Sequence, residues 1–367
     1  MNSRRIRHYL RMGFGHLDGI LLVLIACVLL ISAAVVFSAS GQSMARFSGH
    51  LINMGLALGV MVFMANVPPH LLARVGPGLY VAGVVLLVGV ALFGEVRNGA
   101  RRWIDLGFAF QPSELLKLAL PLMLAWYFQR HEATLQLKHY GVGALLLVLP
   151  FLLILRQPDL GTAMLIGASG FYLLFFAGLS WKIIIGGGTL ALASLPLMWN
   201  LMHDYQRLRV MTLLDPSSDP LGAGYHIIQS SIAIGAGGIQ GSGWMEGTQN
   251  QLDFIPERTT DFIFAVFGEE FGYLGALLLM ALYLGIVARG LLIAARAPSL
   301  FGRLMAATIS LNFFTYVFVN MGMVSGVLPV VGVPLPLMSY GGTAMITLLL
   351  GLGIVMSVGT HRQLNKS

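Results

Sequence analysis

Long apolar segments separated by short polar connections dominate the pattern of this chain. An α-helix needs about 20 residues to cross the roughly 30 Å hydrocarbon core of a bilayer. We expect helices of that kind over residues 17–37, 49–67, 77–94, 112–129, 139–155, 160–178, 181–200, 262–288, 303–327 and 338–359. The pattern predicts an all-α polytopic membrane protein with about ten transmembrane helices, built as a single integral membrane domain over residues 1–367.

Two polar connections are longer than the others. The first covers residues 95–111, and the second is a large extracytoplasmic loop over residues 201–261, between the seventh and eighth predicted helices. A long loop in a compact protein is usually functional or disordered. Residues 225–235 have the pattern of a short amphipathic or re-entrant helix, which favours an ordered loop.

Composition supports the membrane assignment, because 57% of the residues are hydrophobic and only 10% are charged. Of the 22 Lys and Arg residues, 13 fall on the side of the two termini, eight fall on the other side, and Lys117 lies within a span. This bias follows the positive-inside rule and predicts that both termini are cytoplasmic. The net charge of +7 is therefore a topology signal and not the footprint of a nucleic-acid-binding protein.

The acidic residues gather on the other side of the predicted membrane. Charge near a bilayer is costly and persists mainly where function needs it. Eleven acidic residues share that side: Glu95, Asp105, Glu114, Asp159, Asp204, Asp215, Asp219, Glu246, Asp253, Glu257 and Asp261. We expect any chemistry to take place on this extracytoplasmic face.

Cysteine and histidine give no sign of a cofactor. The single Cys27 excludes an internal disulfide, and the nine histidines show no metal-ligand spacing. There is no glycine-rich phosphate loop. A carboxylate-bound Mg²⁺ or Mn²⁺ is compatible with the sequence but is not specified by it, so the cofactor stays unknown.

Asp261 is the candidate catalytic residue. Thr259 or Thr260 can cap a helix whose first turn then contains Asp261, and the helix dipole would keep that carboxylate ionised at neutral pH. An ionised carboxylate at a wet helix mouth can act as a general base. The alternative is a carboxylate that only caps the helix.

Lys117 and Glu114 form a second candidate group. Pro112 suits the first position of a helix, and Glu114 and Lys117 then share one face at i, i+3. Lys117 lies about one turn inside the membrane boundary, where it either snorkels outward or pairs with an acidic partner, Glu114 or Asp261. The alternative to a substrate-binding role is a structural ion pair.

Three further polar groups lie on the same predicted side. Arg101, Arg102 and Trp103 would suit a phosphate or sugar carboxylate beneath an aromatic lid, or they form an exposed basic patch. Asp159 stands at a helix start, as a substrate ligand or as a cap. The adjacent Glu269-Glu270 lies two turns deeper, where a structural hydrogen-bond network is the alternative to a proton relay.

Together these motifs resemble the SEDS family (shape, elongation, division and sporulation) of bacterial cell-wall polymerases. The resemblance runs from the first span to the last, and within the family it favours the elongation branch over the division branch because of the short termini and residues 254–258. Its motifs here are Arg101-Arg102-Trp103, Gln111-Pro112-Ser113-Glu114, Gln157-Pro158-Asp159-Leu160-Gly161-Thr162, Tyr205-Gln206-Arg207, Gly224-Tyr225-His226, Thr260-Asp261, Gly268-Glu269-Glu270 and Ser339-Tyr340-Gly341-Gly342.

The resemblance implies a peptidoglycan glycosyltransferase of the bacterial inner membrane, active on its outer face. It would join lipid II into β-1,4-linked glycan with inversion and release undecaprenyl pyrophosphate. The family's essential carboxylate matches Asp261, and the substrate-binding candidates are Lys117, Glu114, Arg101, Arg102, Trp103, Asp159 and Arg207. The implied partners are lipid II, the undecaprenyl-linked nascent glycan, a class B penicillin-binding protein, other elongation-complex proteins and membrane lipids, and no nucleic acid.

Two other classes of function compete with the polymerase. Buried carboxylates such as Glu270 also serve proton relays, so a lipid-linked oligosaccharide flippase or transporter is one alternative. A non-catalytic scaffold of the elongation complex is the other. Polymer formation from lipid II, and its dependence on Asp261, discriminates between the three.

Overall fold

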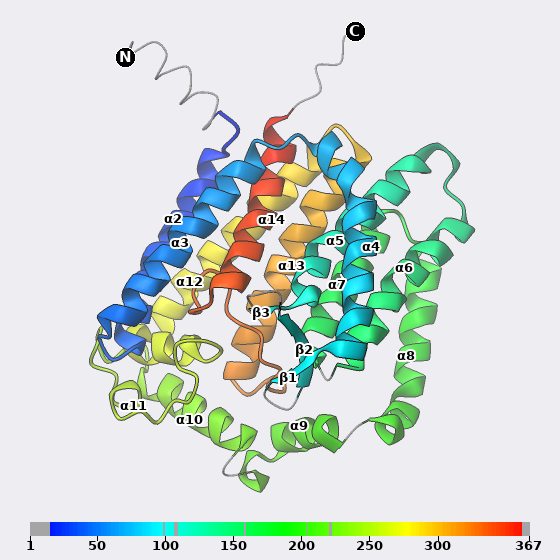
Figure 1. Ribbon diagram of the computed structural model, residues 1–367. Helices are drawn as coiled ribbons and strands as arrows, with labels where there is room; N and C mark the ends of the chain where they lie inside the picture. Colours follow the sequence, from blue (N-terminus) through cyan, green and yellow to red (C-terminus); the bar gives the residue numbers. More distant parts are fainter. Residues whose placement is uncertain are drawn as a thin grey trace, which may run out of the picture.

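The computed structural model describes residues 15–97, 100–105, 109–157, 159–202, 204–219 and 222–361. Within these ranges ten long helices run back and forth between two ends of a bundle (Figure 1). They are α2 (Gly19–Ala39), α3 (Met44–Ala65), α4 (Pro69–Phe93), α5 (Pro112–Arg130), α6 (Leu137–Leu155), α7 (Leu160–Phe176), α8 (Trp181–Leu201), α12 (Ile263–Ala295), α13 (Leu300–Val324) and α14 (Gly342–Thr360). The all-α polytopic fold is confirmed, and each predicted segment overlaps one of these helices.

Seven of the ten helices are long and apolar enough to cross a membrane. α7 and the Trp181–Leu197 part of α8 are apolar but shorter, and α5 carries Glu114 and Lys117. In α13, 78% of the most apolar window is buried, against 17% in α3. α13 is therefore the central helix of the bundle, while α3 turns most of its surface outward, towards lipid.

Short elements cover one end of the bundle, at the bottom of Figure 1. Three antiparallel strands, β1 (Glu95–Arg97), β2 (Ala100–Asp105) and β3 (Ala109–Phe110), pair in the order β1-β2-β3. The segment between α8 and α12 contains α9 (Asp204–Leu214), η2 (Pro216–Ser218), α10 (Ala223–Ala236) and α11 (Thr248–Gln251). The short helix expected at residues 225–235 is present as α10, whereas the small sheet was not predicted.

Local sequence explains where several helices begin. Asp159 accepts from the Thr162 backbone N–H at 3.1 Å and caps α7, and Pro112 opens α5, where a missing N–H costs nothing. Asp18 caps α2 through the Leu21 N–H at 2.9 Å. These caps satisfy N–H groups that a helix start leaves without a partner.

The two ends of the described chain lie together at the other end of the bundle, at the top of Figure 1. The rings of His16 and His361 stack with centroids 4.1 Å apart. Asp18 also accepts from Arg289 near the end of α12, at 2.6 Å to Nη2. Below, this end is called the terminal end, and the end with the strands and α9–α11 is called the loop end. Glu132–Thr134 (η1) joins α5 to α6 at the terminal end.

Candidate functional site

Asp261 lies at the loop end, immediately before α12. The backbone of residues 259–261 is held by hydrogen bonds from α13 and from the segment between α13 and α14. The bonds run from Tyr340 N to Thr259 O (2.7 Å), from Ser339 Oγ to Thr260 O (2.6 Å) and from Asn320 Nδ2 to Asp261 O (2.8 Å). The Asp261 backbone is therefore fixed by residues that are about 60 to 80 positions away in the sequence.

The Asp261 carboxylate is mostly buried and stands against the backbone of Gly332. A Cβ placed on Gly332 would lie 3.4 Å from Asp261 Oδ2. Burial, and then the nearby carboxylate of Glu257, raises the pKa of Asp261 to about 6. Both effects disfavour the charged form. At pH 7 the group is still largely ionised, but close enough to its pKa to take up a proton.

The helix start differs from the sequence expectation. α12 begins at Ile263, with Phe262 as its N-cap and no side-chain cap, so Asp261 precedes the helix and is not part of its first turn. Thr260 Oγ1 donates to the Glu257 carboxylate at 2.8 Å and to no group of the helix. The expectation failed because a turn over residues 256–262, stabilised by the tertiary contacts above, occupies the positions assigned to the first helical turn.

Lys117 and Glu114 form a close ion pair on α5, at 2.5 Å between Lys117 Nζ and Glu114 Oε1. Of the two partners left open by the sequence, the structure selects Glu114. Lys117 Nζ also stands 5.5 Å from the ring centroid of Tyr316 on α13. The second oxygen of Glu114, Oε2, is buried and has no hydrogen-bond partner in the described part of the chain. The same is true of Ser113 Oγ. The pair therefore has polar capacity left for a ligand.

Asp159 connects α7 to the strand segment. Its Oδ1 caps α7, and its Oδ2 accepts from Gln111 Nε2 at 3.1 Å. Arg102 Nη1 lies 3.8 Å from the same Oδ2, and Arg102 Nε donates to the Gln157 backbone carbonyl at 3.1 Å. The capping role considered for Asp159 is confirmed, and the same carboxylate also orients a guanidinium beside the α5 start.

The backbone of residues 331–333 lies between Gly161, two residues after Asp159, and Asp261. Gly161 packs so closely on residues 331–333 that a Cβ there would come within 2.7 Å of Val331 O. The central residue of this segment, Gly332, faces Asp261. Gly161 of α7, Asn320 of α13 and Asp261 before α12 thus meet the same backbone segment at the loop end of the bundle.

Three other predicted residues are not joined to this group by contacts in the described residues. Trp103 is partly buried in β2, opposite Glu95 of β1. Arg101 belongs to the same strand, and its side chain lies outside the described part of the structure. Arg207 on α9 donates to the carbonyl groups of Trp199 and Asn200, at 2.9 and 2.8 Å, and so caps the end of α8.

Glu269 and Glu270 lie in a buried polar network. Glu269 accepts from the backbone N–H groups of Gln249 and Asn250, at 2.7 and 3.1 Å, and thereby holds α11 against α12. Glu270 accepts from Ser38 of α2 and from Asn250 at 3.4 Å. This arrangement is the structural network named as the alternative for the two carboxylates.

Sequence reasoning missed the residues that position Asp261. Asn320 is fully buried in α13, and its amide donates to Asp261 O and to Val333 O, the latter at 2.7 Å. A buried amide inside a membrane span was the available signal, because such a group must find partners. Nothing local marked Gly332, whose role depends on a contact between distant segments.

The described residues contain no group of three or more His, Cys, Asp or Glu side chains that could hold a metal ion. Mg²⁺ and Mn²⁺ prefer several oxygen ligands, and here the Asp261 neighbourhood offers two carboxylates, those of Asp261 and Glu257. These residues alone do not make a metal site.

Comparison with known proteins gives consistent matches over nearly the whole chain. The family model of FtsW, RodA and SpoVE, described as "Cell cycle protein", matches residues 16–364. The peptidoglycan glycosyltransferase MrdB of Escherichia coli (strain K12) is 53% identical over 351 residues, which cover 95% of each chain.

Two solved structures are similar in fold as well as in sequence. One, from "Structural coordination of polymerization and crosslinking by a peptidoglycan synthase complex", has a TM-score of 0.80 and 34% identity over 93% of this chain and 97% of that one. The rod shape determining protein RodA of Thermus thermophilus has a TM-score of 0.71 and 30% identity over 94% and 97%. These matches confirm the resemblance inferred from the motifs.

Proposed function

The chain belongs to the FtsW, RodA and SpoVE family of cell cycle proteins, and from this premise we propose that it polymerises lipid II during cell elongation. It is a peptidoglycan glycosyltransferase embedded in the membrane as a multi-pass protein. The observation that carries the assignment is the 53% identity to MrdB over 95% of both chains. The substrate, the roles of the site residues, the orientation in the membrane and the partner are parts of the proposal.

Asp261 acts as the general base. It takes the proton of the acceptor 4-hydroxyl on the GlcNAc of lipid II, and that oxygen attacks the anomeric carbon at the end of the growing chain. The new C–O bond forms on the face opposite the leaving group, so the product is β-1,4-linked. The bond to the diphosphate breaks, and undecaprenyl pyrophosphate departs with the electron pair. A base with a pKa of about 6 suits this step, because it is mostly ionised at neutral pH and still basic enough to accept a proton.

The diphosphate needs cations near the membrane surface. Lys117 and Arg102 are proposed for this role, with Arg101 beside Arg102 on β2. Charge-assisted hydrogen bonds from such groups stabilise an oxyanion most where water is excluded. Lys117 meets this condition, because only 11% of its side chain is exposed.

The other candidates are proposed to orient the sugars. Glu114 has a free buried carboxylate oxygen that can accept from a hydroxyl, and Asp159 holds Arg102 in place. Trp103 offers an aromatic face to a sugar ring. Arg207 is proposed as an outer contact of the loop end. Its guanidinium already serves two carbonyl groups at the end of α8, so its contacts support a binding role least.

The loop end is proposed to face the outside of the cytoplasmic membrane, with both termini inside, because the distribution of Lys and Arg favours this orientation. One similar structure comes from a complex that couples polymerization and crosslinking. We therefore propose a crosslinking transpeptidase, a class B penicillin-binding protein, as the partner of this chain.

Polymerisation of lipid II by the purified protein together with such a partner tests the proposal. Wild-type protein is expected to yield glycan polymer, and Asp261→Asn is expected to lower the rate about 100-fold or more, in line with the loss of a general base. Glu246→Gln is the matched control, because Glu246 is an exposed carboxylate of the same loop region. Equal polymer from the Asp261 variant would refute the base assignment. Transbilayer movement of lipid II without polymer would favour a flippase, in which Glu270, with its unpartnered Oε2, is the natural proton carrier.

A further inference from the structure

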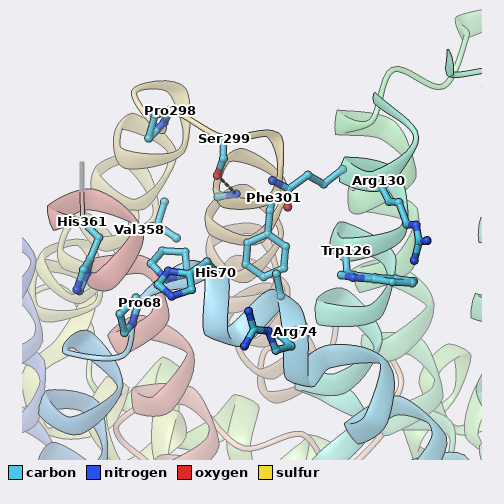
Figure 2. A pocket seen from close by; sticks show the side chains of 14 residues that line it. Pro68, His70, Arg74, Trp126, Arg130, Pro298, Ser299, Phe301, Val358 and His361 are labelled. Carbon is cyan, nitrogen blue, oxygen red and sulfur yellow. Dashed lines mark hydrogen bonds between the residues drawn. The ribbon is translucent and has the colours of Figure 1, made fainter. Parts of the chain in front are cut away.

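A cavity of about 630 Å³ opens at the terminal end of the bundle, at the opposite end from Asp261. It is formed where α4 and α13 begin and where α5 and α14 end, and Figure 2 shows the side chains around it. None of the residues proposed for glycan polymerisation lines it. The cavity therefore requires an explanation of its own.

Among the described residues, those that line this cavity include cationic side chains and no acidic one. Arg74 of α4 and Arg130 of α5 both contribute, with His70 one turn before Arg74 (Figure 2). The Arg130 guanidinium stands 5.5 Å from the ring of Trp126, which also lines the cavity. This contact restricts the guanidinium and leaves its N–H groups available to an anion.

The two arginines have no carboxylate partner among the described residues. The acidic residues at this end, Asp18 and Glu132, pair instead with Arg289 and Arg303, at 2.6 and 3.4 Å. The positive charge at the cavity is therefore not neutralised from within the described protein.

Helix dipoles do not decide the charge of the cavity. The positive ends of α4 and α13 border it, and so do the negative ends of α5 and α14. These contributions oppose one another, since each helix end carries a partial charge of about half a unit. The positive charge at the cavity therefore comes from the Arg74 and Arg130 side chains.

The rest of the wall is largely apolar. Phe301, Val358 and the prolines Pro68 and Pro298 line the same cavity. A cavity that offers both guanidinium groups and apolar surface fits an amphiphile better than a small inorganic anion. Its position at one end of membrane-spanning helices puts it level with lipid headgroups.

We propose that this cavity binds the phosphate headgroup of an anionic phospholipid from the leaflet at the terminal end. The phosphate oxygens accept hydrogen bonds from Arg74 and Arg130, and the glycerol and upper acyl carbons contact the Phe301 side of the wall. The proposal rests on the membrane-spanning fold and this cavity, and it holds whether or not Asp261 is a general base.

Lipid binding to the detergent-solubilised full-length protein tests this proposal. The protein is titrated by calorimetry with dioctanoyl phosphatidylglycerol, with dioctanoyl phosphatidylcholine and with inorganic phosphate. The variant Arg74→Gln/Arg130→Gln removes both guanidinium groups. The matched control Lys138→Gln/Arg296→Gln removes the same charge from exposed residues at the same end that do not line the cavity. Melting temperatures show that each variant is folded.

Phosphatidylglycerol is expected to bind wild type and control alike, and the cavity variant at least about tenfold more weakly, since charge-assisted hydrogen bonds are lost. Phosphatidylcholine and inorganic phosphate are each expected to bind more weakly than phosphatidylglycerol. Equal affinity of the cavity variant and the control would overturn the site. If phosphatidylcholine bound as tightly as phosphatidylglycerol, the cavity would not select anionic lipids. If inorganic phosphate bound as tightly, the cavity would be a site for free phosphate and not for a lipid headgroup.

Discussion

Gly332 lies against the carboxylate of Asp261, with the position of a missing Cβ 3.4 Å from Asp261 Oδ2. The φ angle of Gly332 is +71°, a left-handed conformation that residues with a Cβ rarely adopt. The glycine has two effects here. It allows the segment between α13 and α14 to turn, and it keeps the space beside Asp261 Oδ2 free of a side chain.

Gly332→Ala is expected to lower polymerisation about tenfold or more. At 3.4 Å the new methyl group fits in ordinary contact, but it covers Oδ2, which the acceptor hydroxyl must approach to about 2.6–3.2 Å. Rates with lipid II give the measurement.

Gly326→Ala is the control for backbone strain. Gly326 lies in the same segment with φ +70°, and its Cβ would contact Ile227, away from Asp261. Both variants should lose about 1–2 kcal/mol of stability from the left-handed conformation. If the two also lost the same activity, strain alone would explain the result and the space beside Asp261 Oδ2 would be irrelevant.

The pH dependence of polymerisation should report Asp261. Because the base must be ionised and its pKa is about 6, kcat/KM is expected to be level near neutral pH and to fall as the pH drops through 6. Glu257→Gln removes the nearby negative charge that helps to raise this pKa, so the acid limb should move to lower pH. An unchanged limb in this variant would show that another group controls it.

Asp261→Asn, expected to lower the rate about 100-fold or more, should also be more stable than wild type at neutral pH. The folded-state pKa of Asp261 is raised, so burial of its ionised form destabilises the fold above pH 6, and this penalty disappears as the pH falls towards 4. The neutral amide removes the penalty, a gain of roughly 1–3 kcal/mol. Thermal unfolding at pH 7.5 and at pH 4.5 should show a clearly larger gain at the higher pH. A lower melting temperature at pH 7.5 would mean that the carboxylate is structural.

Asn320→Ala is expected to lower both stability and activity. The amide serves the backbone carbonyl groups of Asp261 and Val333, and their loss should cost about 1–3 kcal/mol. Ser310→Ala is the control on the same helix, because its buried hydroxyl donates only to Ala306 O one turn earlier. Activity should fall only in the Asn320 variant, since only that change releases the Asp261 backbone. Full activity would contradict this positioning role.

The Lys117–Glu114 pair should behave as a buried unit. Side-chain exposure is 11% for Lys117 and 19% for Glu114, so Lys117→Met leaves a buried carboxylate without its cation, at a cost of about 3–5 kcal/mol. Adding Glu114→Gln should recover much of this stability but not the activity.

The Arg303–Glu132 pair provides an exposed ion pair for comparison with the buried Lys117–Glu114 pair. Its side chains are 50% and 52% exposed, and Arg303→Met should cost less than about 1 kcal/mol. Melting temperatures in detergent and rates with lipid II measure both effects. Recovery of activity in the Lys117→Met/Glu114→Gln double variant would show that the pair is only structural.

Much of the fold is readable from the sequence because a bilayer imposes it. Backbone polar groups must be satisfied within each helix, so long apolar segments become spanning helices, and the ten predicted segments all meet one. Local chemistry was equally readable: the Asp159 cap and the Lys117–Glu114 pair depend on residues three positions apart. The family motifs also identified Asp261 as the residue to examine.

The environment of Asp261 was decided only by the tertiary structure. Asn320 and Gly332 reach it from α13 and from the segment that follows, more than fifty residues away, and no local pattern encodes such a meeting. The sequence placed Asp261 in a helical turn with a dipole to stabilise its charge. The fold puts it instead in a turn where burial, and then the nearby Glu257 carboxylate, raise its pKa. Local propensity determines the helices, but the free energy of a charged group depends on everything packed around it, and that becomes defined only when distant segments come together.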